Sequence, residues 1–121
     1  MGTGTSSQPL RPQLSECVIE ADWEGVRQKS DELLHALIED SRQAARVGAK
    51  IVFWQEYAVV VLQDDEGASI ERGRELARQE NVYLGMALFT ITRAFPDELG
   101  ENKVIWIAPS GDVMEEYIKS R

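Results

Sequence analysis

Cysteine and histidine are nearly missing from this sequence, which has one of each among its 121 residues, Cys17 and His35. A single cysteine excludes a disulfide within the chain, and one cysteine with one histidine cannot form a Cys/His zinc site. No glycine-rich loop that would cradle a phosphate follows any of the predicted strands. We therefore expect no metal and no cofactor, and we interpret His35, beside an apolar helical stripe, as a structural residue.

Long hydrophobic runs and an excess of positive charge are also lacking. No apolar run approaches the roughly 20 residues that cross a bilayer, so we expect no membrane segment in this chain. The 13 basic and 21 acidic residues give a formal net charge of −8, which is the wrong sign for a nucleic-acid partner. The opening residues do not resemble a secretory signal, and nothing in the sequence indicates a cellular location.

The remaining composition is typical of one globular domain, with 43% apolar and 28% charged residues. The opening segment, MGTGTSSQPLRPQ, is rich in Gly, Ser, Thr and Pro. Such a segment cannot bury enough apolar surface to offset the entropy lost when it becomes ordered. We therefore predict a disordered tail over residues 1–13 and a single domain over residues 14–121.

Two segments have the periodicity of amphipathic helices. The first is predicted over Trp23–Val47, with Asp22 as its N-cap and Gly48 in the left-handed conformation after its end. The second is predicted over Ser69–Glu80, where Asn81 closes it as a left-handed cap. In both segments apolar residues recur at spacings of three and four, so each helix should present one apolar stripe to a sheet.

Several apolar segments are predicted to form that sheet. Ile51–Trp54 is continuously apolar, which is typical of a strand buried on both faces, and we expect Phe53 and Trp54 to lie between the first helix and the sheet. Further strands are predicted over Val82–Thr92, Lys103–Pro109 and Val113–Lys119, and Cys17–Ile19 is considered as a short edge strand. This order predicts an α/β fold that starts with parallel crossovers and ends in an antiparallel hairpin.

One acid, Glu56, follows the apolar strand Ile51–Trp54 almost directly. Open α/β folds bind their ligands at the carboxyl edge of the sheet, which is where we expect this carboxylate. From the local pattern alone a solvated loop acid is the better interpretation, because most glutamates are exposed. A chemical role for Glu56 therefore depends on motifs elsewhere in the chain.

The order of several motifs resembles the carbon-nitrogen hydrolase (nitrilase) superfamily, and most closely its apolipoprotein N-acyltransferase branch. The motifs are IVFWQE after a helix that ends in Gly-Ala, NVYLG after the second helix, and finally ENKVIWIAPSGDVMEEYIK. The resemblance covers about residues 23–121. It implies an α/β fold that forms part of an α-β-β-α sandwich of the nitrilase type, with a mixed sheet and two main helices.

In that family a glutamate at a strand exit is the general base, a lysine after a Tyr-x step stabilises the oxyanion, and a later cysteine is the nucleophile. The resemblance implies these catalytic roles for Glu56 and Lys119, and a structural or supporting place for Asn102. An exposed lysine near a chain end is the alternative for Lys119. The implied substrate of the whole domain is a small-molecule amide or acyl compound, and we expect Glu56 and Lys119 to face one cleft.

The family's nucleophile has no counterpart, because no cysteine follows Lys119 and Cys17 lies on the wrong side of Glu56 in chain order. We therefore interpret the chain as the amino-terminal part of a catalytic domain that is inactive alone. The alternative is a non-catalytic α/β interaction module of the same fold. Half a sandwich leaves sheet faces and edges uncovered, which predicts a tendency to self-associate.

Overall fold

The computed structural model describes residues 14–54 and 59–120. Its elements are α1 (Leu14–Ile19), α2 (Trp23–Arg46), β1 (Ile51–Phe53), β2 (Val59–Leu62), the 3-10 turn η2 (Gln63–Asp65), α3 (Glu66–Glu80), β3 (Tyr83–Ile91), β4 (Glu101–Ile107) and β5 (Val113–Ser120). The predicted α/β class, with a mixed sheet and two main helices, is confirmed. The predicted tail over residues 1–13 lies outside the described residues.

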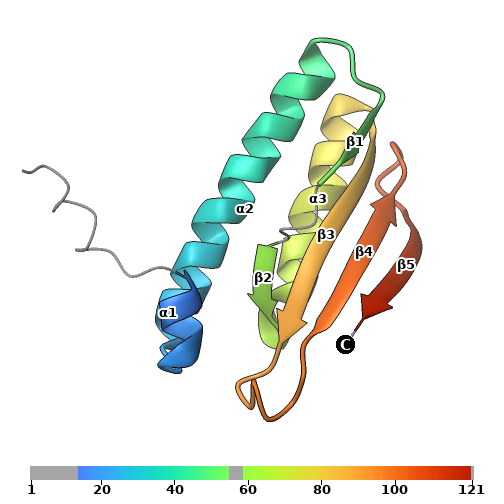
Figure 1. Ribbon diagram of the computed structural model, residues 1–121. Coiled ribbons are helices and arrows are strands. Elements are labelled where there is room, and N and C mark those ends of the chain that lie inside the picture. The colour runs from blue at the N-terminus through green and yellow to red at the C-terminus, as the bar shows by residue number, and fades with distance from the viewer. Residues whose placement is uncertain (1–13, 55–58, 121) are drawn as a thin grey trace, which may run out of the picture.

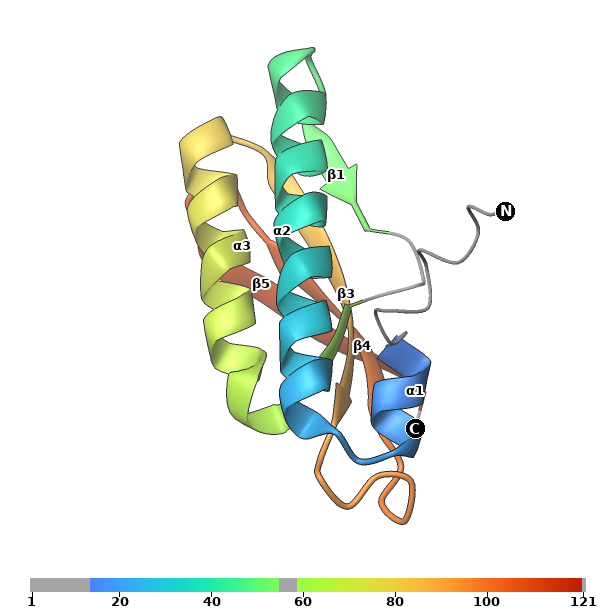
Figure 2. The ribbon, with the colours of Figure 1, turned by 90° about the vertical axis from the view of Figure 1, so that its left-hand side faces the viewer.

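The strands form one five-stranded mixed sheet (Figure 1). β1 and β2 follow one another along the same side of β3, and both run parallel to it. β4 pairs antiparallel with the other side of β3, and β5 pairs antiparallel with β4, as the predicted hairpin requires. The long helices α2 and α3 lie side by side and cover one face of this sheet (Figure 2). We call the opposite face the open face.

The predicted helix ends are confirmed by their caps. Asp22 is the N-cap of α2, and its side chain accepts a hydrogen bond of 3.0 Å from the backbone amide of Gly25. Gly48 has a φ of 115° just after α2, and Asn81 has a φ of 58° at the end of α3, both in the left-handed region. α3 begins earlier than predicted, at Glu66, because the 3-10 turn η2 leads directly into it.

The main core lies between the two long helices and the sheet. Its fully buried members from the sheet include Leu84, Met86, Leu88, Ile105 and Ile107. Trp54 belongs to the same core with 3% exposure, and its indole nitrogen donates a hydrogen bond of 2.8 Å to the hydroxyl of Ser41 on α2. The expected position of Trp54, between the first helix and the sheet, is therefore confirmed.

The expected burial of Phe53 is wrong, because its side chain is 50% exposed. β1 is a three-residue edge strand, and its alternate residues Ile51 and Phe53 point to the open face, where Ile51 is 62% exposed. Phe53 stacks there on Trp106, with ring centroids 5.5 Å apart. Gly85 lies beneath this pair, and a Cβ at that position would come within 2.7 Å of the Phe53 ring. The strand is therefore half-buried on one face, at Val52, and exposed on the other.

One further expectation is wrong, and one strand of the sheet was not expected. Cys17–Ile19 is not a strand but part of the helix α1, which packs against α2 and buries Cys17. Tertiary packing here overrides the strand preference of a short β-branched run. The second strand segment, β2, was not predicted at all, although its residues are apolar and largely buried. It is only four residues long, which is too short for periodicity to separate a strand from a loop.

Candidate active site

Glu56, the expected general base, lies outside the described residues, but both of its flanks are defined. On one side the backbone amide of Trp54 donates a hydrogen bond of 2.9 Å to the carbonyl of Gly85 on β3. On the other side Val59 pairs with Leu88, which is also on β3. The two described strands that flank Glu56 in the sequence, β1 and β2, therefore pair with the same strand, β3.

Lys119, the expected oxyanion stabiliser, lies on β5 at a β-bulge. Ile118 pairs with Lys103 and Ser120 pairs with Asn102, so two steps along β5 correspond to one step along β4. Lys119 is the extra residue, and it is exposed. A bulge bends its strand and re-aims a side chain, and bulges are common next to active sites. The register therefore gives Lys119 a local geometry that regular pairing would not.

Asn102 lies beside this bulge on the neighbouring strand. It is the first partner of β5 after the register shift, and on its other side it pairs with Phe89 of β3. The structure therefore brings together two of the three residues that the resemblance singles out, Asn102 and Lys119. β3 and β4 separate β5 from the segments that flank Glu56, so the expected meeting of Glu56 and Lys119 stays a prediction.

An ionic cluster around the buried side chain of Lys103 was not predicted. Lys103 is 6% exposed, and its ammonium lies 2.9 Å from Glu66, 3.2 Å from Glu116 and 3.5 Å from Glu101. Glu66 also accepts a hydrogen bond of 2.6 Å from the hydroxyl of Thr90. Burial alone would lower the pKa of Lys103, but hydrogen bonds and charges from Glu66 and Glu116 outweigh it and raise this pKa. The cluster ties α3 to β4 and β5.

One sequence signal could have revealed this cluster. In ENKVIWI the residues Lys103, Ile105 and Ile107 alternate, so they share the face of β4 that turns toward the helices. A lysine on such a face is rarely left without acidic partners. The partners themselves could not be identified, because Glu66 belongs to a different element and only the fold brings it near.

Replacing Lys103 by methionine should lower the free energy of unfolding by about 1–3 kcal/mol at neutral pH, because Glu66 and its neighbours lose their shared cation. Since folding raises the pKa of Lys103, its contribution is complete below about pH 10.4 and is lost as the pH rises through the folded-state pKa. In urea unfolding, the natural chain and the variant should therefore differ widely in their free energy of unfolding at pH 7. This difference should become smaller at alkaline pH. Lys50→Met, at an exposed position, is the control. No gap at pH 7, or a gap that widens in alkali, would contradict the cluster's role.

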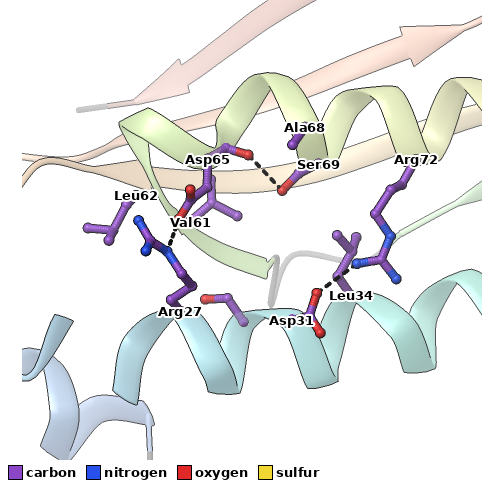
Figure 3. Close-up of a pocket in the computed structure, with 10 residues that line it drawn as sticks. Arg27, Asp31, Leu34, Val61, Leu62, Asp65, Ala68, Ser69 and Arg72 are labelled. Carbon is purple, nitrogen blue, oxygen red and sulfur yellow. Dashed lines mark hydrogen bonds and ion pairs between the residues drawn. The ribbon is translucent and has the colours of Figure 1, made fainter. Parts of the chain in front are cut away.

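A pocket of about 240 Å³ lies between α2 and α3 (Figure 3). Its charged side chains pair with each other across the pocket: Arg27 of α2 donates to Asp65 of η2 over 2.8 Å, and Arg72 of α3 donates to Asp31 of α2 over 2.8 Å. Neither Asn102 nor Lys119 lines it. We interpret this pocket as a structural feature, in which ion pairs connect α2 to η2 and α3, and not as the candidate active site.

Three further properties of the described residues limit the kinds of site that they can form. Within residues 14–54 and 59–120, no three His, Cys, Asp or Glu side chains are grouped so that they could hold a metal ion. No helix in the same ranges is both long enough and apolar enough to cross a membrane. Burial, followed by the charge of nearby Asp22, raises the pKa of the Cys17 thiol, which makes it a poor nucleophile.

The sequence matches no protein-family model and no curated protein. The fold, in contrast, is similar to solved structures. An N-terminal amidase with a bound Asn-Glu peptide superposes with a TM-score of 0.50 at 16% identity, over 72% of this chain and 24% of that chain. The C. elegans NitFhit protein gives a TM-score of 0.53 at 22% identity, over 78% of this chain and 24% of that chain.

Both of these proteins are members of the carbon-nitrogen hydrolase (nitrilase) superfamily. At such identities the similarity is informative about the fold, and it shows that this chain has the α/β fold of the nitrilase type. The chain spans about a quarter of the length of each compared structure, 24% in both cases.

Proposed function

We propose that the chain is the amino-terminal part of a carbon-nitrogen hydrolase-like catalytic domain that hydrolyses amides or transfers N-acyl groups. In this proposal Glu56 is the general base, Lys119 stabilises the oxyanion, and Asn102 supports the strand that carries Lys119. The observation that carries it is the nitrilase-type fold combined with a β-bulge at Lys119, directly beside Asn102. The order of the motifs favours the apolipoprotein N-acyltransferase branch within the superfamily.

The chemistry requires a thiol from a part of the domain that is not in this chain. Glu56 would take the thiol proton, and the thiolate would add to the amide carbonyl carbon to form a C–S bond. Lys119 would stabilise the negative charge that develops on the carbonyl oxygen. The C–N bond then breaks, and the amine leaves with the proton from Glu56. Water or a second amine would then add to the thioester carbonyl and give its proton to Glu56, and the C–S bond would break, so that the acid or the new amide leaves and the thiol takes the proton back. Cys17 is unsuited to the nucleophile's role, because it is 1% exposed and its thiol pKa is raised.

The compared structures support an amide as the substrate class. Those of the N-terminal amidase hold short peptides, namely Asn-Glu, Gln-Gly and Gln-Val. For this chain we propose a small-molecule amide or acyl compound that binds once the whole domain is assembled. A peptide with an amide at its end belongs to the same chemical class.

A non-catalytic interaction module of the same fold is the second candidate, and the open face favours it. Four large side chains on this face are substantially exposed: Ile51, Phe53, Tyr83 and Tyr117. Exposed apolar groups that gather on one face commonly mark an interaction site, and self-association through this face is one form of it. A cysteine on a strand-to-helix turn encoded beyond Arg121 supports the enzyme, and its absence supports the module.

We expect the 121-residue chain alone to show no turnover of amide or ester substrates. A base and an oxyanion stabiliser without a nucleophile cannot form the acyl-enzyme, and members of a triad act as a unit. The measurement is product formation by chromatography, together with intact-protein mass spectrometry for a covalent acyl adduct. Turnover that Glu56→Gln abolishes, or an acyl adduct on Cys17, would overturn the proposal that the nucleophile lies outside this chain.

A further inference from the structure

The β-bulge at Lys119 lies close to the end of an edge strand. β5 pairs with β4 on one side, and no strand that the structure describes pairs with its other side. The strand ends one residue after Lys119, at Ser120. A bulge disrupts the ladder of hydrogen bonds, and strand ends open most readily, so backbone pairing alone holds this part of β5 weakly. A fixed position for Lys119 therefore requires a further contact between β5 and the rest of the fold.

Lys103 makes such a contact immediately before the bulge. It pairs with Ile118, the residue that precedes Lys119. Its ammonium donates a hydrogen bond of 3.2 Å to the carboxylate of Glu116, the diagonal neighbour on β5. Glu116 pairs with Ile105, a member of the main core, so Lys103 and Glu116 lie on the face of the sheet that the helices cover. This ion pair joins β4 to β5 from the helix-covered face.

Glu66 keeps the ammonium of Lys103 in place. It is the first residue of α3, its carboxylate lies 2.9 Å from the ammonium, and it accepts a hydrogen bond of 2.6 Å from the hydroxyl of Thr90 on β3. Because Lys103 is 6% exposed, moving its ammonium away from either carboxylate would leave a buried charge with fewer partners, which is costly. Charge-assisted hydrogen bonds of this kind are about twice as strong as neutral ones. The contact that reaches β5 is therefore anchored on both α3 and β3.

We infer that Lys103 is a positioning residue for Lys119, because through Glu116 it keeps β5 against β4 beside the bulge and fixes the place of Lys119 next to Asn102. Lys103 acts on Lys119 through the backbone of β5. The inference rests on the proposed function for what Lys119 does in the reaction, whereas the position of Lys119 can be measured without any reaction. The competing interpretation is that the ionic cluster only adds to the stability of the whole fold.

The first test is nuclear magnetic resonance on the 121-residue chain with Glu116→Ala. This variant removes the contact to β5 but leaves the other ion pairs of the cluster intact, so the fold should be retained. We expect loss of the backbone nuclear Overhauser effects between Asn102 and Ser120. The backbone order parameter of Lys119 should fall from about 0.85, typical of a rigid backbone, to below about 0.6. The nuclear Overhauser effects between β3 and β4 should remain.

Glu115→Ala is the matched control. Glu115 is exposed like its neighbour Glu116, but it pairs with Trp106 and so lies on the open face. Because the two variants remove the same side chain and the same charge from one strand, Glu115→Ala should leave both signals at the bulge unchanged. Lys103→Met should reproduce the effect of Glu116→Ala. The double variant should have no larger effect at Lys119 than Lys103→Met alone, because both substitutions break one contact.

The second test is steady-state kinetics on a gene product that carries this chain with its catalytic thiol. Displacement of the oxyanion stabiliser affects the transition state more than the bound substrate. Glu116→Ala should therefore lower kcat about 10–10²-fold and change KM by less than about twofold. Glu115→Ala should leave both constants unchanged. A cluster that only adds stability would lower the midpoint of urea unfolding and leave kcat per folded molecule as it is.

Three results would overturn the inference. The first is an unchanged order parameter at Lys119 with retained nuclear Overhauser effects in Glu116→Ala, and the second is an equal change in Glu115→Ala. The third is an unchanged kcat in Glu116→Ala of a protein that Lys119→Met inactivates. Failure of the proposed function looks different: Lys119→Met would leave the kinetics intact, while the two signals at the bulge would still depend on Glu116.

Discussion

Glu56→Gln will lower kcat/KM for an amide substrate by about 10²–10⁴-fold in a gene product that carries this chain with its catalytic thiol. Glutamine keeps the size of the side chain but cannot accept the proton of that thiol, so the thiolate forms far more slowly. The measurement is steady-state kinetics on the purified protein. Glu75→Gln, which removes an exposed carboxylate from α3, is the matched control and should leave kinetics unchanged.

The same experiment separates a base from a structural acid. If Glu56 only supported the fold, Glu56→Gln would lower the midpoint of urea unfolding and would reduce activity no more than that loss explains. Unchanged stability with a large loss of kcat/KM indicates chemistry. Full activity in Glu56→Gln would remove Glu56 from the catalytic proposal and leave the solvated loop acid as its interpretation.

Trp54→Ala should cost about 3–5 kcal/mol of unfolding free energy, the largest effect on stability that we expect from one substitution. The side chain is 3% exposed in the main core, so its removal leaves a cavity that the packed neighbours cannot fill. The hydroxyl of Ser41, also buried, loses the indole hydrogen bond of 2.8 Å. Urea unfolding followed by far-UV circular dichroism measures the change.

Phe53→Ala is the natural comparison, because it removes the aromatic ring next to Trp54 in the sequence. Phe53 is 50% exposed and contributes mainly its stacking on Trp106, so we expect a smaller cost of about 1 kcal/mol. Trp54→Phe keeps an aromatic ring in the core but loses the bond to Ser41, and its cost should lie between the two. Equal costs for Phe53→Ala and Trp54→Ala would mean that the open face is covered in solution.

The features that could be predicted from the sequence are those that local chemistry decides. The cap at Asp22, the left-handed residue Asn81 and the apolar stripe of α2 each depend on residues close together in the chain. The features that were missed depend on distant partners. Only packing on α2 makes Cys17 helical, and only the edge position of β1 exposes Phe53.

The features of the candidate site can also be separated into those that the sequence could predict and those that depend on the pairing of distant strands. The motifs could place Lys119 at the end of a strand and Asn102 at the start of its neighbour, and the structure has both on those strands. The bulge at Lys119 could not be predicted, because it is a property of the register between β4 and β5. The second strand on this edge, β2, likewise could not be predicted, because it is defined by its pairing with β3.

The strand that carries Lys119 also affects solubility. β5 pairs with β4 on one side, and in the described part of the chain no strand pairs with its other side, which leaves a template for adding strands of another molecule. Charged side chains at Glu115, Glu116 and Lys119 make such addition costly. A substitution that neutralises Lys119 to probe catalysis therefore also weakens a barrier to edge-to-edge aggregation. Lys119→Arg, which keeps the charge, separates loss of chemistry from loss of soluble protein.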